Sequence, residues 1–105
     1  MIRGSTRVFG LLGDPVSHSL SPAMHNAAFL ALGIDAVYVA IRTRSTELAG
    51  LIRGLAAAGG GGNITGPHKA QAAGCLSGLD PSLPAANTFW GEGPAALGAN
   101  TDPDG

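Results

Sequence analysis

A strand gives way to a helix within the seven residues Asn63-Ile64-Thr65-Gly66-Pro67-His68-Lys69, which follow four glycines, Gly59 to Gly62. Ile64 belongs to a brief apolar segment, and Pro67 suits a first helical position because its φ is fixed and it lacks an N–H. Lys69 therefore falls in the first helical turn, where the backbone dipoles destabilise an ammonium group. A lysine held against that field is a candidate for proton exchange, although a side chain pointing into water is an equally simple interpretation.

A first strand and helix precede this stretch. The apolar run Arg7 to Leu12 ends at Gly13-Asp14-Pro15 and reads as a buried strand followed by a loop. Ser21-Pro22 predicts an N-cap and a first-turn proline, and Gly33 predicts the end of that helix. Its apolar face is expected at Met24, Ala27, Ala28 and Ala31, with Phe29 and Leu32 beside them.

A second strand and helix follow. The β-branched and aromatic run Ala36 to Ile41 predicts a strand. Ser45 or Thr46 is expected to cap the next helix, with Glu47 in its first turn. The apolar stripe of this helix is predicted at Leu48, Leu51, Ile52 and Leu55.

The alternation of strands and helices predicts an α/β fold, a three-layer αβα sandwich with a mainly parallel sheet. Residues 87–90 and 97–100 predict a hairpin that adds antiparallel strands. Ligands of such sheets bind where strands end and helices begin. The loops at residues 13–22 and 63–69 are therefore expected to face one cleft.

The composition limits the classes of partner and cofactor that this chain can have. The 105 residues are 45% hydrophobic, which suits one small domain, and the net charge of -1 without a basic run favours neither nucleic acid nor a membrane surface as partner. The single Cys75 excludes an internal disulfide or a cysteine-based zinc cage, and no histidine spacing indicates a metal. Without a leader or a long apolar run, we expect a cytoplasmic protein with a small-molecule ligand.

Two serines are the first candidates for ligand binding. Ser19 and Ser21 flank the start of the first helix, where free N–H groups and the dipole favour an anion, and each hydroxyl can donate to one carboxylate. The alternative is that both serines only shape the turn.

Further polar residues suit a hydroxylated ligand and a proton transfer. Asn63, Thr65 and Asn87 could bind ligand hydroxyls, or else satisfy local backbone groups. Asp102 is the candidate partner for Lys69. The pattern Gly91-Glu-Gly93-Pro-Ala-Ala96 resembles a dinucleotide motif, but no helix follows it, so a hairpin tip is expected.

Four ordered motifs give the sequence a specific resemblance, from Phe9 to Gly105, to the substrate-binding domain of the shikimate dehydrogenase family. They are Gly13-Asp-Pro-Val-Ser-His-Ser19-Leu-Ser21-Pro22 with His25-Asn26 and Phe29; Asn63-Ile-Thr65-Gly-Pro-His-Lys69; Asn87-Thr88; and Asn100-Thr101-Asp102-x-x-Gly105. By this resemblance Ser19 and Ser21 hold the substrate carboxylate, and Lys69 is the catalytic acid/base paired with Asp102. The resemblance also implies substrate binding by Asn63, Thr65, Asn87 and Thr101.

The resemblance implies reversible hydride transfer between NADPH and the C3 carbonyl of 3-dehydroshikimate, giving shikimate in aromatic amino acid (chorismate) biosynthesis. It implies that residues 1–105 are the substrate-binding domain, and that NADP(H) is bound mainly by a second domain that this chain lacks. The alternatives are a quinate or aminoshikimate dehydrogenase relative, and a non-catalytic module that binds a hydroxylated cyclic carboxylate. Apolar surface normally covered by the missing part could lead to self-association.

Overall fold

The computed structural model describes residues 1–66, 68–75, 87–92 and 95–99. Within them the elements run in the order β1 (Arg7–Gly13), α1 (Ser21–Leu32), β2 (Ala36–Arg42), a 3-10 turn η1 (Ser45–Glu47), α2 (Leu48–Ala57), β3 (Gly61–Ile64), α3 (His68–Ala73), β4 (Thr88–Glu92) and β5 (Ala95–Ala99). The predicted alternation of strands and helices is confirmed.

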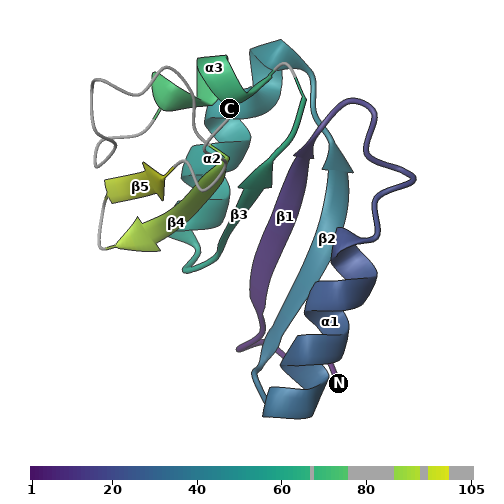
Figure 1. Cartoon of the computed structure of the whole chain (residues 1–105). Helices are drawn as coiled ribbons and strands as arrows, with labels where there is room; N and C mark the ends of the chain where they lie inside the picture. The colour runs from purple at the N-terminus through teal and green to yellow at the C-terminus, as the bar shows by residue number, and fades with distance from the viewer. Residues whose placement is uncertain (67, 76–86, 93–94, 100–105) are drawn as a thin grey trace.

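The five strands of the described residues form one sheet in the order β2-β1-β3-β4-β5 (Figure 1). β1 pairs in parallel with both β2 and β3, whereas β3–β4 and β4–β5 are antiparallel. This confirms a mainly parallel sheet extended by a hairpin. The carboxyl ends of β1, β2 and β3 lie at one edge of the sheet, together with the start of β4.

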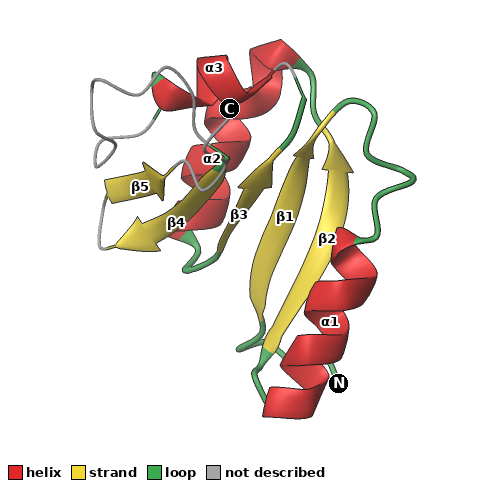
Figure 2. Ribbon diagram, viewed as in Figure 1, coloured by secondary structure: helices red, strands yellow, loops and turns green. Residues whose placement is uncertain are grey.

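Helices cover both faces of the sheet (Figure 2). On one face α2 packs on β3 and β4, and the predicted stripe is confirmed, because Leu48 and Ile52 are fully buried while Leu51 and Leu55 pack against them. The cluster also contains Leu12, Ile64, Ala72 and Phe89. On the other face α1 lies over β2, next to a smaller cluster of Leu11, Val16 and Tyr38.

The predicted apolar face of α1 is wrong except at Phe29, which packs against the sheet. Met24, Ala27, Ala28 and Ala31 are all exposed, and none of residues 21–32 is fully buried. The face toward the sheet carries Asn26, which bonds to the backbone of Tyr38, and Phe29, whose ring lies 5.8 Å from that of Phe9. Asn26 and Phe29 thus hold α1 to the sheet in place of the expected row of Met24 and alanines, and the periodicity of apolar residues could not reveal the polar contact of Asn26.

Both predicted N-caps are also displaced. Helix α1 begins at Ser21 with Leu20 as its N-cap, because the chain already turns into the helical region at Leu20 and the Met24 amide donates to its carbonyl. Arg44 is extended and η1 comes before α2, so Ser45 and Thr46 lie in a 3-10 turn and Glu47 takes the N-cap position of α2. The C-terminal stop at Gly33, with a left-handed φ of 66°, is confirmed.

The glycine run before Ile64 has a structural reason. A Cβ atom at Gly60 or Gly62 would overlap backbone atoms of β1, and one at Gly61 would overlap the backbone of β4. Strand β3 therefore passes between its neighbours only without side chains at these positions.

Candidate functional site

The loop between β1 and α1 lies against the end of β3. The Thr65 amide donates to the Leu12 carbonyl at 2.9 Å, which extends the contact between the strands by one residue. Gly13 makes the approach possible, because a Cβ there would meet the Thr65 methyl carbon at 2.5 Å. The two predicted ligand loops, 13–22 and 63–69, therefore meet at the carboxyl edge of the sheet.

A cavity of about 270 Å³ lies between these loops. It brings together three of the predicted site residues, Ser19, Ser21 and Thr65. Its remaining lining is Leu11, Pro15, Val16 and His18. The cavity combines an apolar floor with hydroxyl groups at its rim, the composition expected of a small-molecule site.

Ser19 and Ser21 have different roles at the start of α1. The Ser21 amide donates to Ser19 Oγ at 3.1 Å, so Ser19 does part of the capping that was predicted for Ser21. That amide is then committed, and Pro22 has no N–H to offer. The cavity lining also offers three hydroxyl groups as donors, those of Ser19, Ser21 and Thr65.

Asn63 lies on the same sheet face but lines a neighbouring depression, together with Phe9, His25, Tyr38, Thr88 and Trp90. Its Oδ1 accepts a bond from the Tyr38 hydroxyl at 2.8 Å. Its Nδ2 lies 3.4 Å from the Asn87 carbonyl and 3.3 Å from Thr88 Oγ1. The structure thus does not place Asn63 in the lining of the Ser19 cavity.

Asn87 is held at the same edge of the sheet. The Ile64 amide donates to its carbonyl at 2.9 Å, and its own amide donates to the Ala99 carbonyl at 3.1 Å. Its side-chain Oδ1 accepts from the Thr88 hydroxyl at 2.9 Å. Asn87 therefore sits beside the end of β3, one strand away from Thr65.

Lys69 is the second residue of α3 and is half-buried. The helix is fixed to the end of β2, since buried His68 places Nε2 2.7 Å from the Thr43 carbonyl, and Gln71 donates to the Ser45 carbonyl. With only six residues, α3 has a weaker dipole than was assumed for Lys69. Pro67, Thr101 and Asp102 lie outside the described residues, so the proposed Lys69–Asp102 pair remains a prediction.

Residues 11–88 match the family described as the shikimate dehydrogenase substrate binding domain. This chain belongs to that family. It is 47% identical to the shikimate dehydrogenase (NADP(+)) of Geobacter sulfurreducens, over 97% of this chain and 37% of the relative. It therefore spans well under half the length of such curated relatives.

Solved structures of shikimate dehydrogenases share the fold of this domain. One from Listeria monocytogenes in complex with shikimate and NAD matches with a TM-score of 0.83 and 37% identity, covering 92% of this chain and 35% of that one. Another from Thermus thermophilus, in complex with NADP(H) and shikimate, has a TM-score of 0.80 and 35% identity, covering 89% and 37%.

The glycine-containing stretch near the end of the described residues is a hairpin. The stretch containing Gly91 and Ala96 pairs as two antiparallel strands, which confirms a hairpin in place of a strand-turn-helix loop. Across the described ranges, no group of three or more His, Cys, Asp or Glu could hold a metal ion, and no helix is long and apolar enough to span a membrane.

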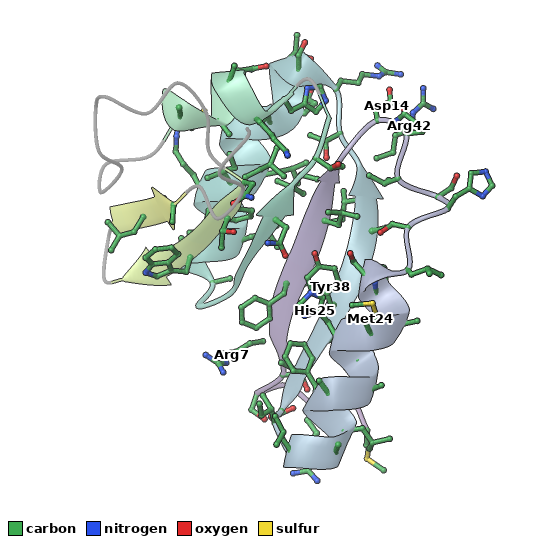
Figure 3. The ribbon with its side chains drawn as sticks, in the orientation of Figure 1. Arg7, Asp14, Met24, His25, Tyr38 and Arg42 are labelled. Atoms are coloured by element: carbon green, nitrogen blue, oxygen red, sulfur yellow. The ribbon has the colours of Figure 1, made fainter. Side chains whose placement is uncertain are left out.

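Sequence reasoning missed Tyr38 and Thr88 as members of the site region. Tyr38 is 3% exposed, stacks on His25 with ring centroids 4.2 Å apart, and has a pKa that burial raises to about 12 (Figure 3). A tyrosine in the middle of a strand expected to be buried needs a partner for its hydroxyl, and that signal could have found it.

Proposed function

We propose that this chain is the substrate-binding and catalytic domain of an NADP-dependent shikimate dehydrogenase. The reaction is the reversible reduction of 3-dehydroshikimate to shikimate in aromatic amino acid (chorismate) biosynthesis. The observation that carries the proposal is the meeting of Ser19, Ser21 and Thr65 around one small cavity, in a domain of this family.

The cavity supports binding of a hydroxylated cyclic acid. Ser19 and Ser21 donate their hydroxyl protons to the two carboxylate oxygens, each bond being charge-assisted. Thr65, on the opposite wall, and Asn87, at the same sheet edge, bind ring hydroxyls, with Asn63 and Thr101 as the further candidates. The apolar floor formed by Leu11 and Val16 lies under the ring.

The proton of the reaction is assigned to Lys69 and Asp102. Hydride arrives at the carbonyl carbon, and Lys69 gives a proton to the oxygen, which becomes the hydroxyl; the reverse reaction returns that proton to the lysine. NADPH, held mainly by a second domain, supplies the hydride. Asp102 keeps the lysine charged and oriented between turnovers.

Residues 1–105 are proposed to form one substrate-binding domain of a cytoplasmic protein, consistent with a single thiol at Cys75. Self-association of the isolated domain is supported by exposed apolar side chains, among them Met24, Leu30 and Trp90.

Calorimetric titration of the purified chain with shikimate tests the binding assignment. Ser19→Ala and Ser21→Ala should each weaken binding by about tenfold or more, because each removes a hydrogen bond to a charged group. Ser17→Ala is the matched control, since Ser17 lies in the same loop but does not line the cavity. Equal affinity for the parent and a Ser19→Ala/Ser21→Ala double variant would contradict the carboxylate anchor. Titration with quinate in parallel separates the two substrate classes.

A further inference from the structure

We propose that His68 and Gln71 are positioning residues for Lys69, the residue assigned to proton transfer. Their side chains tie helix α3 to the backbone of residues 43–45, and the same segment holds the start of the loop that carries Ser19. The inference rests on the proposed function, in which Lys69 meets the substrate. It assigns a role to His68, a buried side chain that the proposed chemistry does not use.

The hydrogen bond of His68 has a definite direction. A backbone carbonyl can only accept, so His68 Nε2 donates to the Thr43 carbonyl over 2.7 Å. His68 is 8% exposed and Thr43 is 1% exposed, so water replaces this bond poorly when it is lost. The start of α3 is therefore held firmly to the end of β2.

Helix α3 depends on such bonds because it is too short to be stable alone. It has six residues, and isolated helices shorter than about 12 residues are marginal in water. Gln71 donates to the Ser45 carbonyl at 2.6 Å and lies on the same helix face as His68. The two bonds fix how α3 is turned about its axis, and Ala72 packs into the core beside them. Lys69 directly follows His68, so the direction of its Cα–Cβ bond is set by the same bonds.

Thr43 is also bonded to the other side of the proposed site. Its amide donates to the Gly13 carbonyl at 2.9 Å, where β1 ends and the loop of Ser19 and Ser21 begins. Its hydroxyl donates to the Ile41 carbonyl at 2.8 Å, which holds Thr43 itself in place. The position of the lysine helix relative to the carboxylate-binding loop is therefore set through Thr43.

This placement matters because proton transfer is sensitive to distance. Donor and acceptor atoms must come within about 2.6–3.2 Å, and a misplacement of about 1 Å can slow a reaction roughly a hundredfold. The ammonium group of Lys69 has three protons, so it can keep a partner within the domain and still donate to a substrate oxygen. His68 and Gln71 supply the position of Lys69, whatever other partner the ammonium group has.

A set of variants separates positioning from packing. His68→Leu keeps apolar volume but removes the donor, whereas the side-chain amide of His68→Gln can donate to the same carbonyl. Gln71→Ala removes the exposed bond and should keep the fold. Ile52→Val is the matched control, because it deletes a methyl group from the core cluster of Ala72 without touching either bond.

The first readout needs no ligand. Lys69 is the only lysine, so the NMR resonances of its ε-CH2 group are identified directly. The two ε protons should differ in the parent, as expected for a side chain held in one orientation. Their separation should narrow in Gln71→Ala and collapse in His68→Leu, and it should persist in His68→Gln and Ile52→Val.

The second readout is the response to shikimate. At saturation, His68→Leu should lose most of the ligand-induced shift of the Lys69 ε-CH2 group, while the amides of Ser19 and Ser21 still shift. Its affinity for shikimate should fall by about two- to tenfold, and His68→Gln should restore both properties. Equal loss of response at Lys69 and at the two serines would show that His68 only supports the fold, which contradicts the proposal.

The two proposals fail in different ways. A parent chain that does not bind shikimate contradicts the proposed function, and the ε protons of the ligand-free chain still decide whether His68 and Gln71 hold Lys69. Equivalent ε protons in the parent, or an unchanged separation in both His68→Leu and Gln71→Ala, contradict the positioning role. If His68→Leu does not fold, His68→Gln and Gln71→Ala decide the question by the same resonances.

Discussion

Asn26 joins α1 to β2 through two hydrogen bonds to the backbone of Tyr38. Its side-chain nitrogen donates to the Tyr38 carbonyl, and its oxygen accepts from the Tyr38 amide, both at 2.8 Å. Within the described residues β2 is an edge strand of the sheet, so these backbone groups have no neighbouring described strand to pair with. The amide of Asn26 takes the place of that strand, and the apolar face of α1 is left outside.

Asn26→Ala should lower the free energy of unfolding by about 1–3 kcal/mol, because it leaves two partly buried backbone groups without partners. Met24→Ala, on the exposed face of the same helix, should change it by about 0.5 kcal/mol or less. Urea unfolding followed by the fluorescence of Trp90, the only tryptophan, measures both. Equal losses in the two variants would show that the helix is held by its apolar face instead.

Tyr38 is the only tyrosine, so its ionisation can be followed directly by absorbance. Burial raises its pKa to about 12 from about 10 in an open chain. The folded chain therefore holds the phenolic proton more tightly, and this contribution to stability is full below pH 10 and is lost as the pH rises through 12. A midpoint near 10 for the folded chain, matching that measured in denaturant, would contradict the burial of Tyr38.

Asp35 has a pKa held below its ordinary value, first by a hydrogen bond from the Ser5 hydroxyl and then by one from Thr6. Its contribution to stability is present above the unfolded pKa and disappears as the pH falls through the lower folded value. Carbon NMR of the Asp35 carboxyl during an acid titration measures this pKa. Ser5→Ala should raise the midpoint and Ser17→Ala should leave it alone; an unchanged midpoint in Ser5→Ala would remove the assigned cause.

Gly61 should not tolerate a side chain. Gly61→Ala would push a methyl group into the backbone of β4, and we expect a loss of about 1–3 kcal/mol or a failure to fold. Gly50→Ala is the matched control, because a Cβ there meets nothing within 4 Å and alanine favours a helix by about 0.5–1 kcal/mol. Thermal melts of the two variants should move in opposite directions. A Gly61→Ala melt at or above that of the parent would refute the close packing of β3.

The sequence predicted the order of strands and helices because their signals are local. Leu48 and Ile52 repeat at helical spacing, and Ala36 to Ile41 is rich in β-branched residues. The folded chain has a helix and a strand at these positions. The N-caps were misplaced because a helix start depends on the turn before it, as at Leu20 and Arg44.

The sequence predicted which site residues follow the ends of parallel strands, but not the hydrogen bonds that these residues make. Ser19, Ser21 and Thr65 follow strand ends that a parallel sheet must bring to one edge, so their meeting could be foreseen. The hydrogen bond between Asn63 and Tyr38 could not be foreseen, because it depends on the strand register and on which way the Asn63 side-chain amide is turned. Asn26 belongs to the first sequence motif, but its hydrogen bonds to the Tyr38 backbone could not be predicted, because they depend on the position of β2 at the edge of the sheet.

The central claim is that this domain binds a hydroxylated cyclic carboxylate between its two loops. The most direct test is to record amide NMR spectra of the isotope-labelled chain during a titration with shikimate. We predict saturable shifts concentrated in residues 13–21, at Thr65 and at Asn87, with the outer face of α1 around Met24 and Ala28 unmoved. No saturable shifts, or shifts gathered around Phe9 and Trp90 in the neighbouring depression, would contradict the assignment.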